Sequence, residues 1–461
     1  MSSQLSQLPV VVIGAGPVGL AAAAQLTERG LPFVVLEAGD GPAAAVREWG
    51  HVRLFSPWRY DIDPAAARLL ADADWVRPAD DKLPTGAELA ADYLQPLADL
   101  PALKPHLRYG ARVVAITRFG LDRVRSAGRE DTPFLVRLAD GADIHARAVI
   151  DASGTWGTPN VLGAFGIPAH GEADVTAYLE NALPDVLGRD RDRFAGRRIL
   201  VVGAGHSAAN TILALAALAE QEPGTAVTWA VRAGSPTRTY GGQSADALPE
   251  RGALGTRLRQ VVETGAVTLL TEFRVQRLTD DGDTVLVSDG ERTVTADRIV
   301  VATGYRPDHT ITSELRLDLD AILGSTRALA PLIDPNEHSC GTVPPHGVDE
   351  LTHPEPGYYA IGVKSYGRAP TFLLATGYEQ ARSVVAALAG DWEAARDVQL
   401  DLPETGVCNS DPVEVDDTIT DGGGCCGAPA TEAGAEPSGG APLNLIALGS
   451  QPVEGRPGTC C

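Results

Sequence analysis

Short runs of consecutive apolar residues recur along this chain, and several of them end directly at glycine or other small residues. The runs at 10–13 and 199–202 are apolar at every position, which is typical of parallel strands buried on both faces. Alanine-rich stretches at 21–29 and 211–220 follow them and predict helices. Further strands are expected at 33–37, 226–232, 148–154 and 298–307, the last two running into small residues. This alternation predicts α/β domains built on parallel sheets.

A glycine-rich turn joins strand to helix at 14–19 and again 189 residues later. In the first turn Gly14 makes the bend, Gly16 lets the backbone approach phosphates, and Gly19 lets helix and strand pack closely. The second turn fills the same places with Gly203, Gly205 and Ala208, and the predicted sites also include Pro17, His206 and Ser207. Such turns bind a pyrophosphate through backbone N–H groups and a helix dipole. Two of them predict two bound dinucleotides, and hence a redox enzyme.

The residue that follows the next strand differs between the two copies. Glu37 ends the first strand at 33–37, about 20 residues after the turn, where an acid binds a ribose 2′-hydroxyl. In the second copy the strand at 226–232 ends in Arg232, which suits the 2′-phosphate of NADP. Arg238 is a second candidate for that role, and a solvated surface arginine without a ligand is the alternative for Arg232.

Composition limits the class of partner. The chain has 461 residues, enough for two or three domains, and 44% of them are apolar, which supports large cores. Its net charge of −22 argues against nucleic acid or an anionic membrane surface as a partner. No apolar stretch resembles a membrane span, so we expect a cytoplasmic protein with reduced thiols.

The expected fold is α/β, with two Rossmann-like, three-layer dinucleotide-binding domains and a discontinuous first domain. The predicted boundaries are 1–163 for the first part of that domain, 164–303 for the second domain, 304–395 for the return to the first, and 396–461 for a tail. The first part carries a β-rich excursion at 111–148, and a helix at 373–389 closes the return. The stretch 401–461 holds ten acids, one basic residue and no aromatic residue, so a disordered tail is predicted.

Together, the turn at 14–19 with Glu37, Ala152-Ser153-Gly154, the turn at 203–208 and Ala302-Thr303-Gly304-Tyr305 resemble the flavin-containing monooxygenase-like group of two-dinucleotide flavoproteins. The resemblance covers residues 9–390. It implies FAD in the first domain, NADPH in the second, and hydride transfer from the nicotinamide to the flavin. In a monooxygenase the reduced flavin then reacts with O₂ and a small-molecule substrate.

The resemblance also implies further cofactor-binding residues. In such proteins the segment after Glu37 approaches the flavin, and the loop 362–371 precedes a helix whose N-terminus lies near the flavin. The residues concerned are Trp49, Arg53, Ser56, Trp58, Ser153, Gly154, Thr303, Gly304, Tyr305, Gly362 and Thr371, with Phe55 and Pro57 beside them. Ordinary core packing is the alternative for the aromatic residues of this set, and a plain connecting loop is the alternative for 362–371.

One departure from the family pattern separates two kinds of chemistry. Monooxygenases of this group carry Phe-x-Gly-x-x-x-His-x-x-x-(Tyr/Phe) before the second glycine turn. Here Gly166 and His170 keep the spacing, Phe165 is one place off, and Asp174 replaces the final aromatic residue. Electron transfer from NADPH to FAD is therefore better supported than monooxygenation. The dithiol reductases need a redox-active cysteine pair, and in residues 1–390 Cys340 is the only cysteine.

The cysteines suggest a role in metalloid chemistry. Five of the six lie in the tail, at 408, 425, 426, 460 and 461. The adjacent pairs Cys425–Cys426 and Cys460–Cys461 are soft ligands suited to thiophilic ions, and the pattern resembles flavin monooxygenase-like proteins from arsenic-resistance gene sets. Metalloid capture, incidental cysteines and a redox relay all stay open. The loop 337–346, with His353 beyond it, is an active-site loop, a metal site or a structural loop, and Cys340 within it is the candidate catalytic residue.

Three functions follow from these observations. The first is an FAD-dependent, flavin monooxygenase-like oxidoreductase that uses NADPH, O₂ and a small-molecule, arsenic-related substrate. The second is an NADPH-dependent flavoprotein reductase of metalloid or disulfide acceptors served by the tail thiols. The third is an FAD-bound protein that sequesters or senses metalloids. A homo-oligomer is compatible with each of them.

Overall fold

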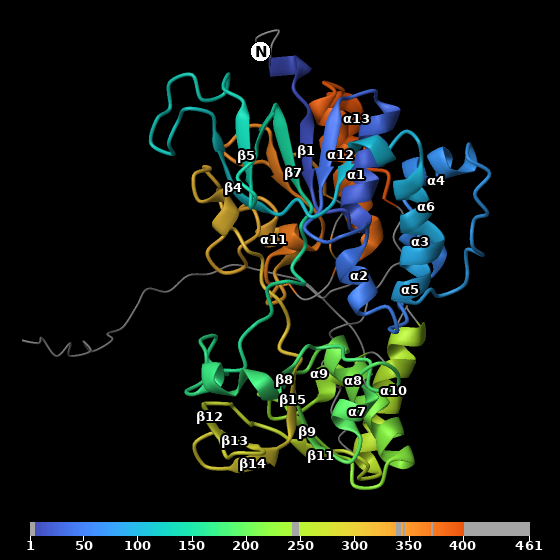
Figure 1. Ribbon diagram of the computed structural model, residues 1–461, viewed down its shortest axis with the longest axis vertical. Coiled ribbons are helices and arrows are strands. Elements are labelled where there is room, and N and C mark those ends of the chain that lie inside the picture. Colours follow the sequence, from blue (N-terminus) through green and yellow to red (C-terminus); the bar gives the residue numbers. More distant parts are fainter. Residues whose placement is uncertain (1–4, 242–248, 338–342, 344–345, 370–371, 401–461) are drawn as a thin grey trace, which may run out of the picture. The chain divides into compact units, whose positions relative to one another are not determined.

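The computed structural model describes residues 5–241, 249–337, 343, 346–369 and 372–400, all within one compact unit, Met1–Pro412. Within this unit, one five-stranded parallel sheet has the strand order β16-β7-β1-β2-β3 (Figure 1). Its strands are β1 (Val10–Ile13), β2 (Phe33–Leu36), β3 (Leu107–Arg108), β7 (Ala148–Asp151) and β16 (Tyr358–Ala360). The last strand comes from far along the chain, so the sheet is completed by a returning segment.

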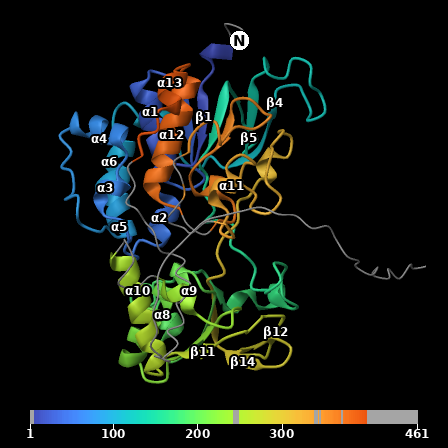
Figure 2. The ribbon, with the colours of Figure 1, turned by 180° about the vertical axis from the view of Figure 1, so that it is seen from behind.

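Two different layers cover the faces of this sheet, because its strands are apolar on both sides. Val10, Val12 and Ile150 pack on one face against the helices α1 (Pro17–Glu28) and α12 (Leu374–Leu388). Figure 2 shows these helices from behind, with α13 (Trp392–Arg396) beside α12. On the other face Val11 and Val149 pack against a small antiparallel sheet, whose strands are β4 (Val113–Arg118), β5 (Phe134–Leu138) and β6 (Asp143–Ala146).

A second five-stranded sheet, with the order β11-β10-β9-β15-β8, repeats this plan. Its strands are β8 (Leu179–Glu180), β9 (Arg198–Val202), β10 (Ala226–Ala230), β11 (Thr268–Leu270) and β15 (Arg298–Val301). The helices α8 (His206–Gln221) and α10 (Pro249–Glu263) share a core with one face. The other face packs on β12 (Arg277–Asp280), β13 (Val285–Ser288) and β14 (Thr293–Ala296). The predicted fold class, with two three-layer dinucleotide-binding units, is confirmed; the exact domain boundaries stay a prediction.

The remaining elements are short and connect these layers. They are η1 (Leu5–Gln7), α2 (Ala44–Glu48), α3 (Trp58–Asp61), α4 (Pro64–Ala71), α5 (Gly86–Glu88), the π-helical turn η2 (Leu89–Leu94), α6 (Gln95–Asp99), η3 (Lys104–His106), η4 (Glu172–Tyr178), α7 (Arg191–Phe194), α9 (Thr237–Tyr240), η6 (Thr310–Thr312), α11 (Ala330–Ile333) and η7 (Gly362–Tyr366). No helix among the described residues is both long enough and apolar enough to cross a bilayer.

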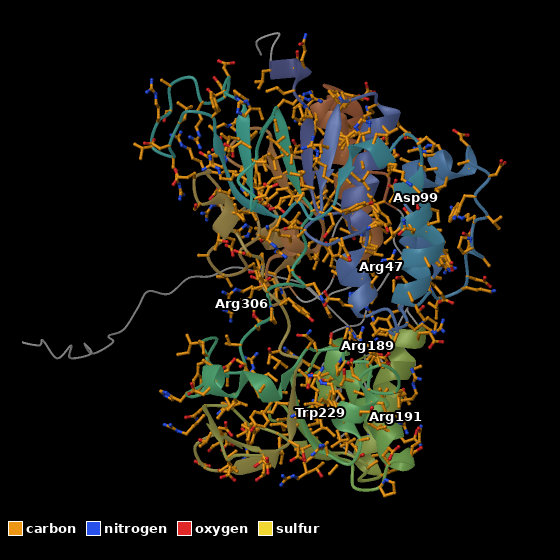
Figure 3. The ribbon with its side chains drawn as sticks, viewed as in Figure 1. Arg47, Asp99, Arg189, Arg191, Trp229 and Arg306 are labelled. Carbon is orange, nitrogen blue, oxygen red and sulfur yellow. The ribbon has the colours of Figure 1, made fainter. Side chains whose placement is uncertain are left out.

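The two segments that connect the sheets are hydrogen-bonded to each other. The side chain of Asn160 donates to the carbonyl oxygen of Thr303 at 2.9 Å, and the Thr303 hydroxyl donates to the carbonyl oxygen of Asn160 at 3.0 Å. Further along, the N–H of Arg306 (labelled in Figure 3) donates to the carbonyl oxygen of Thr158 at 3.0 Å. The outgoing and returning connections are therefore paired with each other.

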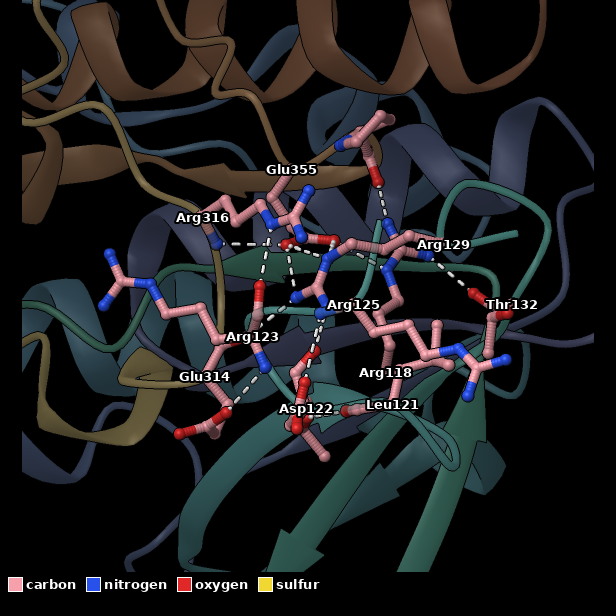
Figure 4. A network of polar contacts seen from close by, with 12 residues as sticks. Arg118, Leu121, Asp122, Arg123, Arg125, Arg129, Thr132, Glu314, Arg316 and Glu355 are labelled. Atoms are coloured by element: carbon pink, nitrogen blue, oxygen red, sulfur yellow. Dashed lines mark hydrogen bonds and ion pairs between the residues drawn. The ribbon is translucent and has the colours of Figure 1, made fainter. Parts of the chain in front are cut away.

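A buried charge network joins the antiparallel sheet to the strand that completes the first parallel sheet (Figure 4). Arg118 and Arg129 both donate to the carboxylate of Glu355, whose side chain is fully buried. The backbone N–H of Arg316 donates to the same carboxylate at 3.0 Å. Charge-assisted bonds of this kind are among the stronger ones in proteins, so the network fixes where β16 starts.

Candidate cofactor-binding site

The first glycine turn has the shape that a pyrophosphate requires. Gly14 has a φ of 97°, and a Cβ there would lie 2.7 Å from the carbonyl oxygen of Ala152. A Cβ at Gly19 would lie 2.0 Å from the carbonyl oxygen of Gly14. By contrast, no atom lies within 4 Å of a Cβ at Gly16, which caps the N-terminus of α1 just before Pro17. The turn is thus closed toward the protein and open at the helix N-terminus, where phosphate oxygens could accept backbone N–H bonds.

Glu37 lies beside this turn rather than pointing away from it. It follows β2 directly, and its carboxylate accepts the backbone N–H groups of Ala15 and Gly39, each at 2.7 Å. Two backbone donors fix the orientation of the carboxylate and leave lone pairs for ligand hydroxyl groups. The position fits the ribose-binding role that the sequence predicts, and no ligand is needed to hold the side chain there.

Two segments that are distant in sequence meet at the same end of the sheet. Ser153 and Gly154 follow β7, and η7 begins at Gly362 just after β16. A Cβ at Gly154 would lie 3.9 Å from the side chain of Val363, and a Cβ at Gly362 would lie 3.4 Å from Val18 of α1. The structure therefore brings the predicted residues at 14–19, 153–154 and 362 together.

Next to these residues lies a buried ion pair that the sequence pattern does not predict. The Lys364 ammonium is 2.6 Å from Oδ2 of Asp151, and both side chains are almost wholly buried. The Tyr358 hydroxyl donates to the same oxygen at 3.0 Å, and the Ser153 hydroxyl donates to Oδ1 at 2.6 Å. Burial alone would raise the pKa of Asp151, but Lys364 and Ser153 hold it below its ordinary value. An acid that ends a fully buried strand was the available signal for this pair.

The second glycine turn repeats the geometry of the first. Gly203 has a φ of 137°, and a Cβ there would lie 2.0 Å from the carbonyl oxygen of Ala302, next to Thr303. No atom lies within 4 Å of a Cβ at Gly205, which caps α8. The indole N–H of Trp229, labelled in Figure 3, donates to the carbonyl oxygen of Gly203 at 2.7 Å and so helps to hold the turn in place. His206 and Ser207 begin α8, and Ala208 is buried beneath them.

Arg232 lies just after β10, as the sequence predicts. Its side chain is exposed and donates to the carbonyl oxygen of Ala164 at 3.1 Å. The short helix α9 also contacts the second turn, because the Thr239 hydroxyl donates to the carbonyl oxygen of Ala204 at 3.0 Å. Arg238, the other cationic candidate, belongs to that helix and is exposed. Both arginines therefore belong to segments next to the second turn.

The segment 49–58 connects the two halves of the site. Phe55 packs with the core of the second sheet, and its ring lies 5.1 Å from that of His206 at the start of α8. Arg53 donates to the carbonyl oxygen of Leu83 at 2.5 Å, Trp49 packs over Gly86, and Trp58 is buried. A cavity of about 650 Å³ opens here. Its lining includes Arg53, Phe55, Trp58, Lys82, Asn210 and Arg257.

An aromatic pair lies at the paired connection between the sheets. The rings of Trp156 and Tyr305 are 5.1 Å apart, and the indole N–H of Trp156 donates to Glu48 at 2.7 Å. Burial, together with the charge of Glu48, raises the pKa of Tyr305 well above its ordinary value, so its hydroxyl stays protonated. Gly304, just before it, has a φ of 89°. The predicted residues 303–305 thus belong to the paired connection, and Thr303 lies beside the second turn.

Several predicted residues lie outside the described part of the chain. They are Thr371, the candidate catalytic Cys340, and the tail cysteines Cys425, Cys426, Cys460 and Cys461. The predictions about the tail and the loop 338–342 therefore stay predictions. His353 is described: it accepts the backbone N–H of Asp318 at 3.2 Å, and burial lowers its pKa to about 4. Among the described residues, no group of three His, Cys, Asp or Glu side chains is placed to hold a metal ion.

Comparison with known proteins identifies relatives of two kinds. A sequence profile described as pyridine nucleotide-disulphide oxidoreductase matches residues 11–339. Indole-3-pyruvate monooxygenase YUCCA1 of Oryza sativa is 29% identical over 201 residues, which are 43% of this chain and 42% of that enzyme. Ferredoxin–NADP reductase of Paramagnetospirillum magneticum is 28% identical over 276 residues, 60% of this chain and 64% of that protein. The matched segments thus cover less than two thirds of either relative.

A solved structure with the same architecture is the bacillithiol disulfide reductase Bdr (YpdA) from Bacillus cereus. It superimposes with a TM-score of 0.61 at 18% identity, covering 83% of this chain and 99% of that chain. At this identity the likeness shows the fold. The homologues are FAD-binding, NADPH-dependent flavoenzymes, so the predicted cofactors are confirmed as those of the family. They include both monooxygenases and reductases.

Proposed function

This chain belongs to the pyridine nucleotide-disulphide oxidoreductase family, and on that basis we propose that it is a monooxygenase-like flavoenzyme that takes electrons from NADPH. In this proposal FAD occupies the turn at Gly14–Gly19 and NADPH the turn at Gly203–Ala208. One observation carries the proposal. Gly16 and Gly205 each cap the N-terminus of a helix, and at both positions there is free space where a Cβ would be. The electron acceptors are O₂ and a small molecule.

Each part of the site has a task in this scheme. FAD, once bound, supplies the hydride-accepting and oxygen-reacting chemistry. The N–H groups at the start of α1 bind its pyrophosphate, and Glu37, held by Ala15 and Gly39, accepts hydroxyl groups of its ribose. The start of α8 binds the pyrophosphate of NADPH. Phe55 and Trp58 restrict water between the two cofactors, which protects a reduced flavin from side reactions.

The cavity beside Phe55 is the proposed place for a small-molecule substrate. Its walls include residues of the predicted flavin-binding segment 49–58, residues 81–83, Asn210 of α8 and Arg257 of α10, so it adjoins both that segment and the helix after the second turn. Its volume of about 650 Å³ suits a small organic molecule. The arsenic link rests on the tail cysteines alone and remains a hypothesis from the sequence.

The proposal is tested by reducing the purified protein with NADPH without oxygen and then adding a pulse of O₂. We expect bound flavin, bleaching of its absorbance by NADPH, and a slow, oxygen-dependent return through a distinct spectral species. Immediate reoxidation with stoichiometric release of peroxide would favour a reductase instead. Flavin that NADPH never bleaches would fit the third function, a protein that binds or senses without turning over.

The reductase is a second candidate because curated and structural relatives carry that activity. In this chain it would depend on cysteines outside the described residues. Replacing the five tail cysteines with serine in the full-length protein separates the two functions. The monooxygenase-like enzyme should keep its NADPH oxidation, whereas a tail-served reductase should lose turnover with every disulfide or metalloid acceptor.

A first prediction concerns the choice of NADPH over NADH. Arg232→Ala should raise KM for NADPH by about 10- to 150-fold, because one charge-assisted contact to the 2′-phosphate is worth about 1.5–3 kcal/mol. KM for NADH should hardly change, since that cofactor lacks the phosphate. Arg238→Ala tests the second candidate in the same way, and the variant with the larger loss selective for NADPH identifies the arginine that binds the 2′-phosphate. Steady-state kinetics with both cofactors checks this, and equal effects on the two would exclude the assigned role of Arg232.

A further inference from the structure

The loop 163–168, which precedes the first strand of the second sheet, exposes two large apolar side chains. Phe165 is 65% exposed and Ile167 is 66% exposed. A single exposed apolar residue is ordinary, but two on one short loop form a patch of the kind that contacts a ligand or a partner. The family pattern gives Phe165 no role, because its phenylalanine stands one place earlier, where this chain has Ala164.

Hydrogen bonds fix this loop at both ends. The Glu172 carboxylate accepts the backbone N–H groups of Leu162 at 2.8 Å and of Ala169 at 2.7 Å. Between them, the N–H of Ala164 donates to the carbonyl oxygen of Val275 at 2.9 Å. Phe165 is therefore presented to solvent by an ordered backbone, which lowers the entropy cost of any contact that its side chain makes.

Two arginines flank Phe165. Arg232 donates to the carbonyl oxygen of Ala164 at 3.1 Å, and Arg306, labelled in Figure 3, donates to that of Gly166 at 3.3 Å. Neither guanidinium forms an ion pair among the residues that the structure describes. Each keeps donors for a ligand, because a guanidinium carries five N–H groups. An aromatic surface bordered by two cations suits a ligand that joins a planar ring to an anionic group.

The patch lies at the carboxyl ends of strands of the second sheet, where α/β folds bind their ligands. Arg232 follows β10, and Arg306 follows β15. In NADPH the 2′-phosphate and the adenine are bonded to adjacent carbons of one ribose. A 2′-phosphate bound by Arg232 therefore brings the adenine close to this loop, and Phe165 directly follows the residue that Arg232 contacts. A planar base stacks well on an aromatic side chain.

We propose that Phe165 stacks on the adenine ring of NADPH and so forms an adenine subsite at the edge of the second cofactor site. This rests on the proposed function, because it requires NADPH at the turn Gly203–Ala208. Arg232 binds the neighbouring phosphate, and Arg306 is a positioning residue that holds the loop through Gly166. Phe165 thus contributes to the binding of NADPH and NADH alike, whereas Arg232 distinguishes between them.

The test measures binding of adenosine 2′,5′-bisphosphate to the full-length holoenzyme by calorimetry. This probe carries the adenine and the 2′-phosphate but no nicotinamide. Phe165→Ala should raise its Kd by about 5- to 150-fold, the loss expected for one stacked base. Phe165→Tyr keeps an aromatic ring and should bind the probe as the natural protein does. Ile167→Ala is the matched control, because that side chain is almost equally exposed on the same loop, and it should leave Kd unchanged.

Kinetics supplies a second readout. Phe165→Ala should raise KM for NADPH and for NADH by similar factors and leave kcat unchanged, because both cofactors carry the adenine. Reduced nicotinamide mononucleotide, which lacks the adenosine half, should reduce the flavin of this variant at the natural rate. Slower reduction would assign Phe165 to the placement of the reacting rings and would overturn the adenine subsite.

The remaining outcomes separate this proposal from the proposed function. A natural protein that neither binds the bisphosphate nor bleaches its flavin with NADPH would contradict the proposed function itself. Bisphosphate binding that is unchanged in Phe165→Ala would overturn the stacking role alone. An equal loss in Ile167→Ala would also overturn it, because the loop would then act as a general apolar surface, as it would for a protein partner.

Discussion

Lys364→Met is expected to destabilise the folded protein by about 3–5 kcal/mol at neutral pH, because it leaves the Asp151 carboxylate buried without its cation. The Lys364 ammonium lies 2.6 Å from Asp151, and both side chains are almost wholly buried. The remaining partners of Asp151, the hydroxyl groups of Tyr358 and Ser153, are neutral. Urea unfolding followed by tryptophan fluorescence measures the loss. A loss below about 1 kcal/mol would mean that water reaches the pair.

The same variant should show a characteristic pH dependence. In the natural protein the pKa of Asp151 lies below its ordinary value, so the stability contributed by the pair is present above about pH 4 and is lost only under stronger acid. Without Lys364, burial raises the pKa of Asp151, so protonation relieves the unpaired charge. The deficit of the variant should therefore be largest near pH 8 and smaller near pH 5.

A double variant distinguishes the lost charge from lost packing. Asp151→Asn combined with Lys364→Met removes both charges and should recover about half or more of the stability, because no uncompensated ion remains. The two residues are in contact, so their effects should be strongly non-additive. A double variant that is as unstable as the sum of the two single ones would assign the loss to packing.

Much of the fold follows from local sequence signals. The strand, glycine turn and helix at each dinucleotide site are contiguous, and Gly14 and Gly203 are required by positive φ angles that other residues rarely adopt. The helix predicted at 373–389 is α12, and the β-rich excursion is the antiparallel sheet β4–β6. The predicted helix at 21–29 starts earlier, at Pro17, because the turn leads straight into the helix. The pattern of apolar residues alone does not show where the turn ends and the helix begins.

The long-range polar contacts could not be predicted in the same way. Asp151 and Lys364 are separated by 213 residues, and nothing in the pattern indicates which of the basic residues reaches that acid. The bonds that Arg118 and Arg129 donate to Glu355 join segments more than 220 residues apart. Tertiary packing, rather than local propensity, selects these partners.

Substitutions in the two glycine turns should distinguish the FAD site from the NADPH site most clearly. Gly16→Val should weaken FAD binding by about 100-fold or more, because the side chain would occupy the space where a phosphate must approach the backbone. The apoprotein should keep its stability, since no atom lies within 4 Å of a Cβ there and the φ of −77° suits any residue. Gly14→Val should instead unfold the region, because its Cβ would lie 2.7 Å from a backbone oxygen. FAD titration of the apoprotein measures the binding.

The corresponding substitution in the second turn is the control for Gly16→Val. Gly205→Val has the same free space and an extended φ of −93°, so the variant should retain FAD and its thermal stability yet lose reduction by NADPH at any practical concentration. A chemical reductant such as dithionite should still bleach its flavin, because that reaction bypasses the second site. The two turns would then differ in the cofactor they hold, as Glu37 and Arg232 predict. Loss of flavin from Gly205→Val, or normal NADPH turnover in it, would contradict the assignment of the second turn to NADPH.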